Sequence, residues 1–317
     1  MQLYEIPEEL KSLYKHWEKH ADAKRASFPP EVPLREPASR ISIPQTRIDP
    51  LITFAAERMR IWNAKTQGLE APYTTDSILA QYRFCNIYRE LDKQTIQYHR
   101  MLKSLTGDFP LWLMNMFFAR LVARPETLET TGLLSFDPKQ NALVYEKLLA
   151  LSSPKYGVPY VFPISTILKT KWNTREKLLC EYLPERIKAC TDVLVASKNR
   201  GVLELMPDVL AAWGFNHAFL WNEVLIDVAY QYPERVDLFK LFPIGPGSRP
   251  TMLMLTPDES PEEACLALSS RDYPAMSLLS LNGKPIPLSA ENWEGIGCEY
   301  RKYTNLLRGI GRKRSFK

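Results

Sequence analysis

Apolar residues recur with a helical period from Leu51 to Tyr232, and this periodicity restricts the possible folds more than any other feature of the chain. Segments in which apolar side chains return every three or four residues, roughly, form amphipathic helices. The segments expected to be helical are 51–67, 77–105, 110–122, 142–152, 174–197 with an interruption at Pro184, 202–212 and 215–232. Strand signals are short and confined to Tyr160–Ile164 and Thr251–Leu255. The sequence therefore predicts a mainly α fold with little or no sheet.

The N-terminal part divides into a charged helix and a connector. Residues 7–27 are expected to form a helix whose apolar stripe of Leu10, Leu13, Tyr14 and Trp17 docks on the main body. Six prolines follow between residues 28 and 50, a density that prevents a regular helix and indicates an extended connector. The predicted organisation is an N-terminal helix at 1–27, a Pro-rich connector at 28–50 and a helical domain at 51–317.

Composition limits the class of protein. With 317 residues, 45% of them apolar, the chain can bury a substantial core. Five scattered cysteines encode neither a disulfide framework nor a zinc site, so we expect reduced thiols. A formal charge of +5 permits a polyanionic partner without requiring one. Because we see no apolar run long enough for a membrane span and no secretory core at the start, we expect a cytoplasmic protein.

A polar cluster marks the segment around Asn86. If residues 77–105 form one helix, its apolar side chains face the core and the other side gathers five polar ones. These are Arg83, Asn86, Arg89, Glu90 and Lys93. Arginine forks bind phosphate oxygens through paired hydrogen bonds, so such a face suits a phosphate-bearing substrate. The alternative is a solvated helix face with ordinary ion pairs, which Glu90 and Lys93 would also satisfy.

A second cluster lies in the apolar segment 213–227. Glu223 and Asp227 stand one turn apart there, where like charges repel. A buried pair of carboxylates tends to share a proton or to raise one pKa, as a general base near neutral pH requires. The alternative is that one of the two acids pairs with an arginine from another helix or lies at the domain rim.

The C-terminal third carries signals for contacts with a nucleic-acid backbone. Residues 244–249 read Ile-Gly-Pro-Gly-Ser-Arg, and glycines let backbone N–H groups approach a phosphate closely. No Gly-Lys-Ser/Thr follows them, so this is not an ATP-binding P-loop. Aromatic and basic residues alternate in Cys298-Glu-Tyr-Arg-Lys-Tyr303, and a basic run from Arg308 to Lys317 follows. For residues 313–317 the alternative is a solvated tail.

In this order, the motifs of residues 82–92, 214–227, 244–247 and 298–303 resemble those of a bacteriophage family. It comprises the helical domain of 5-hydroxymethyluracil DNA kinases and the amino acid:DNA transferases, also called α-glutamyl/putrescinyl thymine pyrophosphorylases. The resemblance covers residues from about 50 to the C-terminus, and it implies a DNA-glycosylase-like helical fold related to helix-hairpin-helix proteins. It also implies a phage protein acting in the cytoplasm of an infected bacterium.

The resemblance further implies a transferase that replaces the pyrophosphate of pyrophosphorylated 5-hydroxymethyluracil in DNA by an amine. The partners would be DNA containing the modified, flipped-out thymine and a donor of the glycine, glutamate or putrescine class. No cofactor is expected beyond a divalent metal with the pyrophosphate. The implied site residues are Asp227, Glu223 and Glu90 for catalysis, Arg83, Asn86, Arg89 and Asp92 for substrate and pyrophosphate, and Gly245, Gly247, Arg249, Lys302 and Arg308 for DNA.

Two positions depart from the family pattern, and other functions stay open. Pro250 and Gly297 stand where the family leads us to expect a small residue and a larger one, respectively. A glycosylase of the same fold would need a catalytic Asp beyond the glycine turn, where Asp258 comes early and Asp272 late. A non-catalytic module for hypermodified DNA would need the basic and aromatic groups without the acids. A metal-dependent nuclease would need clustered carboxylates, which the sequence lacks.

Overall fold

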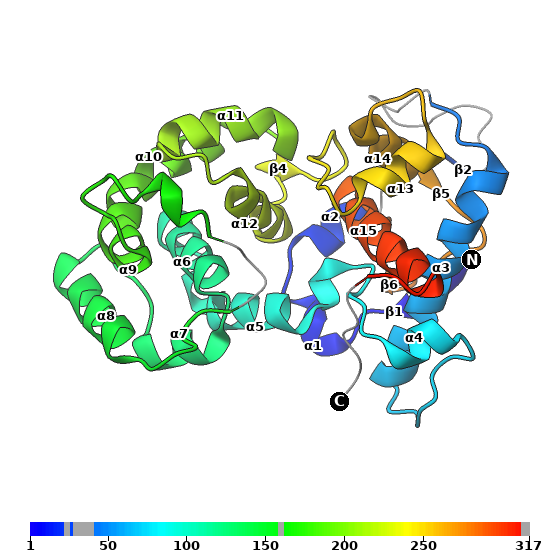
Figure 1. Cartoon of the computed structure of the whole chain (residues 1–317), viewed down its shortest axis with the longest axis horizontal. Coiled ribbons are helices and arrows are strands. Elements are labelled where there is room, and N and C mark those ends of the chain that lie inside the picture. The colour runs from blue at the N-terminus through cyan, green and yellow to red at the C-terminus, as the bar shows by residue number, and fades with distance from the viewer. Residues whose placement is uncertain (22–25, 28–40, 158–161, 312–317) are drawn as a thin grey trace. The chain divides into compact units, whose positions relative to one another are not determined.

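The computed structural model describes residues 1–21, 26–27, 41–157 and 162–311, and the chain divides into two compact units (Figure 1). Unit 1 consists of Met1–Asp92 and Leu238–Lys317, and unit 2 of Lys93–Asp237. The chain enters unit 2 directly after Asp92 and returns to unit 1 at Leu238. Unit 1 is therefore built from both ends of the sequence.

Unit 1 combines helices with short strands. Its first part contains β1 (Gln2–Glu5), α1 (Glu8–Lys11), α2 (His16–Ala21), β2 (Ala26–Ser27), α3 (Gln45–Thr66), α4 (Ser77–Gln81) and the 3-10 turn η1 (Arg89–Leu91). Its second part contains α13 (Arg249–Leu255), α14 (Pro261–Ser269), β5 (Arg271–Asp272), β6 (Ser277–Leu281), β7 (Lys284–Pro285) and α15 (Ala290–Leu307).

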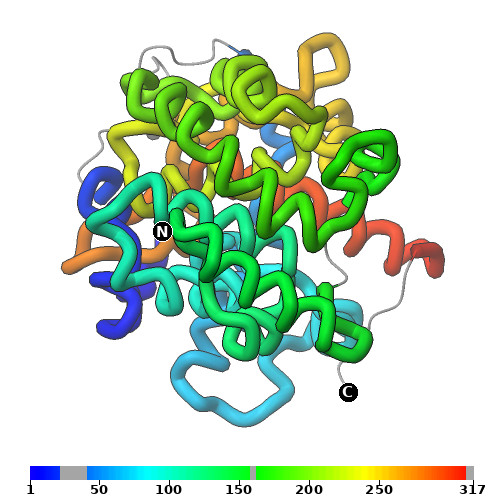
Figure 2. Tube along the Cα trace, turned by 90° about the vertical axis from the view of Figure 1, so that its left-hand side faces the viewer, coloured from blue at the N-terminus to red at the C-terminus, as the bar shows by residue number. Residues whose placement is uncertain are grey.

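The sheet of unit 1 joins the two ends of the chain. Parallel β1 and antiparallel β7 flank β6, with Gln2 opposite Ser277, so the N-terminal trace runs beside residues near 280 (Figure 2). The β6–β7 turn has positive φ at Asn282 and Gly283, the conformation that tight hairpins favour. The carboxylate of Glu5 accepts hydrogen bonds from both turn N–H groups, at 2.7 and 3.2 Å. These bonds and that of Ser280 outweigh partial burial and lower the pKa of Glu5 to about 2.

The helices of unit 1 pack around α15. Helix α15 packs against α3, α13 and α14. It begins with a capping box in which Ser289 and Asn292 satisfy each other's backbone N–H groups. Buried Trp293 and Ile296 fix the inner face of α15, and in its C-terminal half the half-buried rings of Tyr300 and Tyr303 pack against Phe54 of α3.

Unit 2 is a helical body. Its elements are α5 (Lys93–Met101), η2 (Lys103–Leu105), α6 (Phe109–Val122), α7 (Pro125–Thr131), α8 (Pro138–Ala150), η3 (Ile164–Thr166), α9 (Arg175–Lys177), the π-helical turn η4 (Leu178–Tyr182), α10 (Leu183–Ala196), β3 (Arg200–Gly201), α11 (Val202–Trp213), α12 (Ala218–Gln231) and β4 (Val236–Asp237). Helices α6 and α12 are apolar on nearly all sides and pack against each other and against α10 and α11. Fully buried Trp112, Phe117 and Trp221 fill this core.

The predicted mainly α fold is confirmed, and the strand predictions are wrong. Thr251–Leu255 lies in α13, where Pro250 occupies the first turn that suits a residue without an N–H. Of the candidate strand at 160–164, residues 160–161 lie outside the described residues, and Ile164 begins a 3-10 turn. Strand β6 was not predicted, because it is buried on both faces and lacks the alternation of a half-buried strand.

The N-terminal predictions are confirmed in part. Leu10, Leu13, Tyr14 and Trp17 are all buried, but the segment is not one helix over residues 7–27: Leu10 lies in α1, Trp17 lies in α2, and Leu13 and Tyr14 lie in the turn between them. The last six residues of the expected connector, 45–50, form the start of α3, which contains Pro50. Connector residues 28–40 lie outside the described residues. Among the residues described, no helix is long and apolar enough to cross a membrane.

Candidate functional site

Residues 82–88 form an irregular loop, here called the motif loop, so the predicted continuous helix from 77 to 105 is wrong. Helix α4 ends at Gln81, and Tyr82 takes an extended conformation with φ −112° and ψ 149°. Helical structure resumes in η1 and then in α5. The expected common face of five polar side chains consequently does not exist.

Asn86 stabilises this loop through local hydrogen bonds. Its amide Nδ2 donates to the carbonyl oxygen of Leu91 at 3.0 Å and to Oδ1 of Asp92 at 3.1 Å, and its backbone N–H donates to the same Oδ1 at 3.2 Å. Asparagine competes with helix formation in this way because its side chain offers the backbone other partners. Both hydrogens of Nδ2 are used, which leaves Oδ1 of Asn86 as an acceptor for a ligand.

Side chains from α3 and α15 hold the backbone of the motif loop. Nη2 of Arg58 donates to the carbonyl oxygens of Phe84 and Cys85, at 3.0 and 3.1 Å. Glu299 accepts a hydrogen bond from the N–H of Cys85 at 3.2 Å. Lys302 donates to the carbonyl oxygen of Arg83, and its ammonium lies 4.5 Å from the centre of the Phe84 ring. The exposed side chain of Arg83 thus projects from a backbone that is fixed on two sides.

Arg58 is a site residue that sequence reasoning missed. It is only 5% exposed, and burial lowers the pKa of its guanidinium, although nearby Glu299 and Asp92 act against that shift. A signal was present in the sequence. Arg58 stands within the apolar stripe of α3, between buried Ala55 and Ile61, where an unpaired cation would be costly.

Glu90 lies inside unit 1 and not on a polar surface with Arg83. It is 3% exposed, and its Oε1 is 2.9 Å from Nε2 of His16. The amide of Asn292 donates to Oε2 at 3.4 Å, and the hydroxyl of Tyr14 donates to the backbone oxygen at 2.8 Å. Glu90 therefore joins α2, η1 and the start of α15.

The glycine turn, residues 244–249, lies against α15. A Cβ atom on Gly247 would stand 2.5 Å from Sγ of Cys298, so only glycine fits this approach. The N–H of Gly245 donates to Glu294 at 3.3 Å, and Arg301 donates to the carbonyl oxygen of Pro246 at 2.6 Å. The N–H of Gly245 thus has a carboxylate partner in this structure, and its contact with a DNA phosphate stays a prediction.

A cavity of 360 Å³, here called the α15 cavity, opens beside this turn. It is lined by Gly247, Cys298, Glu299, Arg301, Lys302, Asn305, Leu306 and Gly311. Burial and the carboxylates of Glu294 and Glu299 raise the pKa of the Cys298 thiol to about 11, so it stays protonated near neutral pH. The cavity thus offers one carboxylate, two cations and no thiolate.

Asp227 is a buried, ionised carboxylate within unit 2. It is fully buried and receives two hydrogen bonds of 2.6 Å from Arg120 and lies 3.1 Å from Nε2 of His99. Arg120 and His99 overcome the opposing effect of burial and hold the pKa of Asp227 well below its usual value. The expected raised pKa is therefore wrong, and the alternative of an arginine partner from another helix is what the structure shows. Glu223, one turn earlier, is half-buried.

The predicted site residues divide between the two units. Unit 1 holds the motif loop with half-buried Arg89 and Asp92, the glycine turn, and Lys302 and exposed Arg308 of the C-terminal segment. Exposed Arg249 lies 3.4 Å from Glu262. Unit 2 holds Glu223 and Asp227. In the described part of the chain, no three or more His, Cys, Asp or Glu side chains are grouped to hold a metal ion. The catalytic and binding roles of all these residues stay predictions.

Comparisons with known proteins point to one family. Residues 45–309 match the family described as 5-hmdU DNA kinase, helical domain, and this range includes the motif loop, the glycine turn and α15. A 5-hmdU DNA kinase of Bacillus phage SP10 is 33% identical over 130 residues, which are 39% of this chain and 20% of the kinase. The match therefore spans a fifth of that relative. No solved structure matches the chain. The DNA-glycosylase-like fold stays a prediction.

Proposed function

The chain belongs to the family of the 5-hmdU DNA kinase helical domain, and from this premise we propose that it takes part in thymine hypermodification of phage DNA. We propose that it acts as a transferase, which replaces the pyrophosphate of pyrophosphorylated 5-hydroxymethyluracil by an amine. The main observation in support of the proposal is that Arg58, Glu299 and Lys302 hold the backbone of the motif loop, and that Glu299 and Lys302 also line the α15 cavity. Preorganised cations and hydrogen-bond groups of this kind stabilise charge on a leaving group.

The reaction is a substitution at the 5-methylene carbon of the base. The nitrogen lone pair of the amine forms the new C–N bond while the C–O bond breaks, and pyrophosphate leaves with the bonding electrons. Arg83 and Arg89 would bind the phosphate oxygens, and Lys302, which contacts the backbone of Arg83, would add positive charge. Oδ1 of Asn86 would accept a hydrogen bond from the N3–H of the uracil ring, since its amide hydrogens are already used.

The incoming ammonium must lose a proton to a carboxylate. We assign this step to Glu299, because it lines the α15 cavity and contacts the motif loop through the N–H of Cys85. Asp227 is a weaker candidate for a base, since its lowered pKa disfavours taking up a proton. Glu90 and Glu223 stay predicted catalytic residues without such support. A divalent metal that neutralises pyrophosphate is compatible with this scheme.

DNA would be held without reading its sequence. Lys302, Arg249 and Arg308 supply cations for phosphate groups, and the Gly247 turn allows close approach of a backbone. The target base would have to leave the stack, because an enclosing pocket cannot form around a base inside the duplex. Phage DNA with modified thymine and a small amine are thus the proposed partners.

A second candidate is a DNA-binding helical module without transferase activity. The family description favours it, because it names the helical domain of a kinase, and the 317 residues contain no Gly-Lys-Ser/Thr P-loop. Such a module would position modified DNA for a partner that carries the phosphoryl-transfer chemistry. It would need the cations of unit 1 but not Glu299.

Mass spectrometry of nucleosides tests the proposal. DNA containing pyrophosphorylated 5-hydroxymethyluracil is incubated with the full chain and a mixture of amino acids and polyamines, then digested. A new nucleoside with the mass of thymidine plus an amine substituent supports transfer. It should be absent with Arg83→Gln and retained with the control Lys188→Gln, which removes an exposed cation of unit 2. Unchanged nucleosides with intact DNA binding would establish the binding module instead. Abasic sites would establish a glycosylase.

A further inference from the structure

Unit 1 contains a cavity that the proposed function does not use, at the end of α3. Its volume is 520 Å³, and we call it the α3–α4 cavity. It is lined by Ile61 and Lys65 of α3, by Ala71, Pro72, Tyr73 and Thr74 of the following loop, and by Leu79 and Ala80 of α4. Its size suits a small organic ligand. Because most of these side chains are apolar, such a ligand needs an apolar body.

Hydrogen bonds hold the walls of this cavity. Helix α3 ends where Gly68, with φ 69°, turns the chain back, and the N–H of Gly68 donates to the carbonyl oxygen of Lys65 at 3.1 Å. In the loop that follows, the hydroxyl of Thr74 donates to the carboxylate of Glu57 and accepts from the N–H of Asp76 at 3.1 Å. The cavity is therefore preformed, and a ligand does not have to order its walls.

The charged group of this cavity is the ammonium of Lys65, and its surroundings disfavour the charge. Its Nζ lies 5.2 Å from the centre of the Tyr73 ring. Although Lys65 is exposed as a residue, partial burial of its ammonium and the charge of Arg58 lower the pKa of Lys65. A carboxylate bound beside the ammonium would act against both influences.

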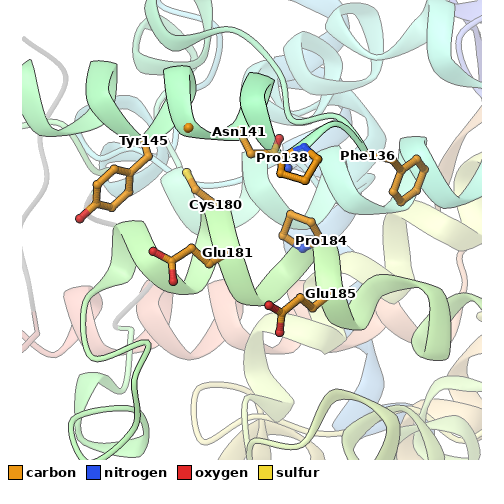
Figure 3. Close-up of a pocket in the computed structure, with 9 residues that line it drawn as sticks. Phe136, Pro138, Asn141, Tyr145, Cys180, Glu181, Pro184 and Glu185 are labelled. Atoms are coloured by element: carbon orange, nitrogen blue, oxygen red, sulfur yellow. The ribbon is translucent and has the colours of Figure 1, made fainter.

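A second cavity, in unit 2, differs in its charge. It has a volume of 390 Å³ and lies between α8 and the segment η4–α10, and Figure 3 shows Glu181 and Glu185 on one of its walls. Both carboxylates are exposed, so water still solvates them, and they give no indication of a ligand. They would repel an anion. This cavity is therefore a control for the charge of a ligand that binds in the α3–α4 cavity.

The lining of the α3–α4 cavity selects among classes of ligand. An amine would bring a second positive charge close to Lys65 and Arg58, so the amine donor of the proposed reaction does not fit here. A nucleobase would leave its hydrogen-bonding edges against apolar walls. An inorganic phosphate ion would leave those walls uncovered. A carboxylate with an aliphatic or aromatic body suits both the cation and the walls.

We propose that the α3–α4 cavity binds a small organic carboxylate, with its charge beside Lys65 and its apolar body against Ile61 and Leu79. An aromatic acid and a short fatty acid carry this same chemistry. Leu79 and Ala80 belong to α4, which ends directly before the motif loop. A bound acid should therefore also stabilise α4. This inference does not require transfer to DNA.

Calorimetric titration of the full chain, without DNA, tests the inference with 4-phenylbutyrate, octanoate and inorganic phosphate. We expect saturable binding of one acid per chain, and the acid that binds more tightly identifies the type of apolar body. The neutral 4-phenylbutyramide should bind more weakly than 4-phenylbutyrate, and the cationic 4-phenylbutylamine more weakly still. The inference is overturned if neither acid binds saturably, if the amine binds as tightly as the acid, or if phosphate does.

Three variants test the site itself. Lys65→Met should bind 4-phenylbutyrate about fivefold to tenfold more weakly, as expected for the loss of one partly desolvated charge contact, and should bind the neutral amide unchanged. The control Lys15→Met removes an exposed cation of unit 1 that does not line the cavity, and it should bind normally. Ala80→Phe places a ring at an exposed position of the lining and should block the acid and the amide alike. Equal binding by Lys65→Met and Lys15→Met contradicts the proposed contact.

Amide hydrogen exchange locates the bound acid. Saturating 4-phenylbutyrate should slow exchange in α4 and leave exchange in α8 unchanged, because the carboxylates beside α8 repel an anion. Protection of α8 without protection of α4 would place the acid in unit 2 and overturn the inference.

Discussion

A guanidinium that is 5% exposed needs acceptors close by, and Arg58 has them in the carbonyl oxygens of Phe84 and Cys85. Arg58→Met should therefore leave two loop carbonyls without their donor and lower the free energy of unfolding by about 1–3 kcal/mol. The motif loop should also lose its fixed shape, so DNA binding and turnover should fall with stability. Urea unfolding and a DNA-binding titration measure the two effects.

Arg60→Met is the matched control for this change. Arg60 lies two residues later on α3, is exposed, and pairs with Glu57 on the same helix. Exposed pairs contribute little to stability. If both variants unfold alike and bind DNA alike, Arg58 does not support the motif loop.

The ion pair of Asp227 and Arg120 should dominate the acid sensitivity of unit 2. Removing one partner of a buried pair leaves the other charge uncompensated, so Asp227→Asn should cost about 3–5 kcal/mol near neutral pH. The pKa of Asp227 is lowered on folding from its usual 3.8. Its contribution is therefore present above that value and is lost as the pH falls below it. The difference in free energy of unfolding between the wild type and Asp227→Asn should therefore be smaller at about pH 3 than at about pH 7.

Replacing both Asp227 and Arg120 distinguishes a structural role of Asp227 from a catalytic one. Asp227→Leu/Arg120→Met should be more stable than Asp227→Asn, because no unpaired charge remains inside. A double variant that regains stability and also modifies DNA would establish Asp227 as structural. A stable double variant without activity would support the original prediction of a catalytic Asp227.

At the scale of elements, the two departures from the family pattern belong to two helices that pack against each other, Pro250 to α13 and Gly297 to α15. A Cβ on Gly297 would stand 2.5 Å from Cε of Met252 and even closer to Oγ of Ser248, so α15 approaches α13 more closely than any side chain allows. Thr251 donates a hydrogen bond of 2.7 Å to the carbonyl oxygen of Gly297 across this contact. Pro250 suits the first turn of α13 because its missing N–H has no helical partner there.

Gly297→Ala and Gly295→Ala form a matched pair on α15. Alanine at 297 should destabilise the chain by about 1–3 kcal/mol, because overpacking pushes α13 away from α15. Alanine at 295 meets no atom within 4 Å and should stabilise the helix by about 0.5–1 kcal/mol. Thermal unfolding of the two variants should shift in opposite directions. Shifts of the same sign would contradict the close helix approach.

The elements that sequence alone predicted well are those whose pattern is local. Helices α6 and α12 appear within a few residues of their predicted bounds, because their apolar residues are sufficient to specify buried helices. The motif loop was predicted as helix because the groups that hold it are distant in sequence. Cys85 contacts Glu299, which is 214 residues away. Asp227 was correctly expected to be buried, but its partner on α6 gives no signal in the sequence near it.

At the scale of the whole molecule, a net charge of +5 should give the proposed DNA binding an electrostatic contribution. We expect the affinity for DNA to fall as salt rises, because bound cations release counterions from phosphate groups. Arg83→Gln and Arg308→Gln should each reduce the slope of log affinity against log salt by roughly one. Both side chains are exposed in unit 1. Filter binding or fluorescence anisotropy over a range of salt concentrations measures the slope.

Lys188→Gln controls for charge alone. Lys188 is an exposed cation of unit 2 that pairs with Asp192 on α10. The Lys188→Gln variant should leave the slope of log affinity against log salt unchanged. An equal fall of the slope for all three variants would mean that DNA affinity depends on net charge and not on the exposed cations of unit 1.

The pairing of β1 with β6 sets the order of events while the chain is being made on the ribosome. Gln2 pairs with Ser277, so the first strand emerges long before its partner exists. At roughly 5–20 residues per second, the delay is on the order of 10–60 s. During that time β1 exposes unpaired backbone groups that another nascent chain can pair with, whereas unit 2 has all its residues once Asp237 is made, before β6 is synthesised. The unit that holds the motif loop is therefore the last to be finished.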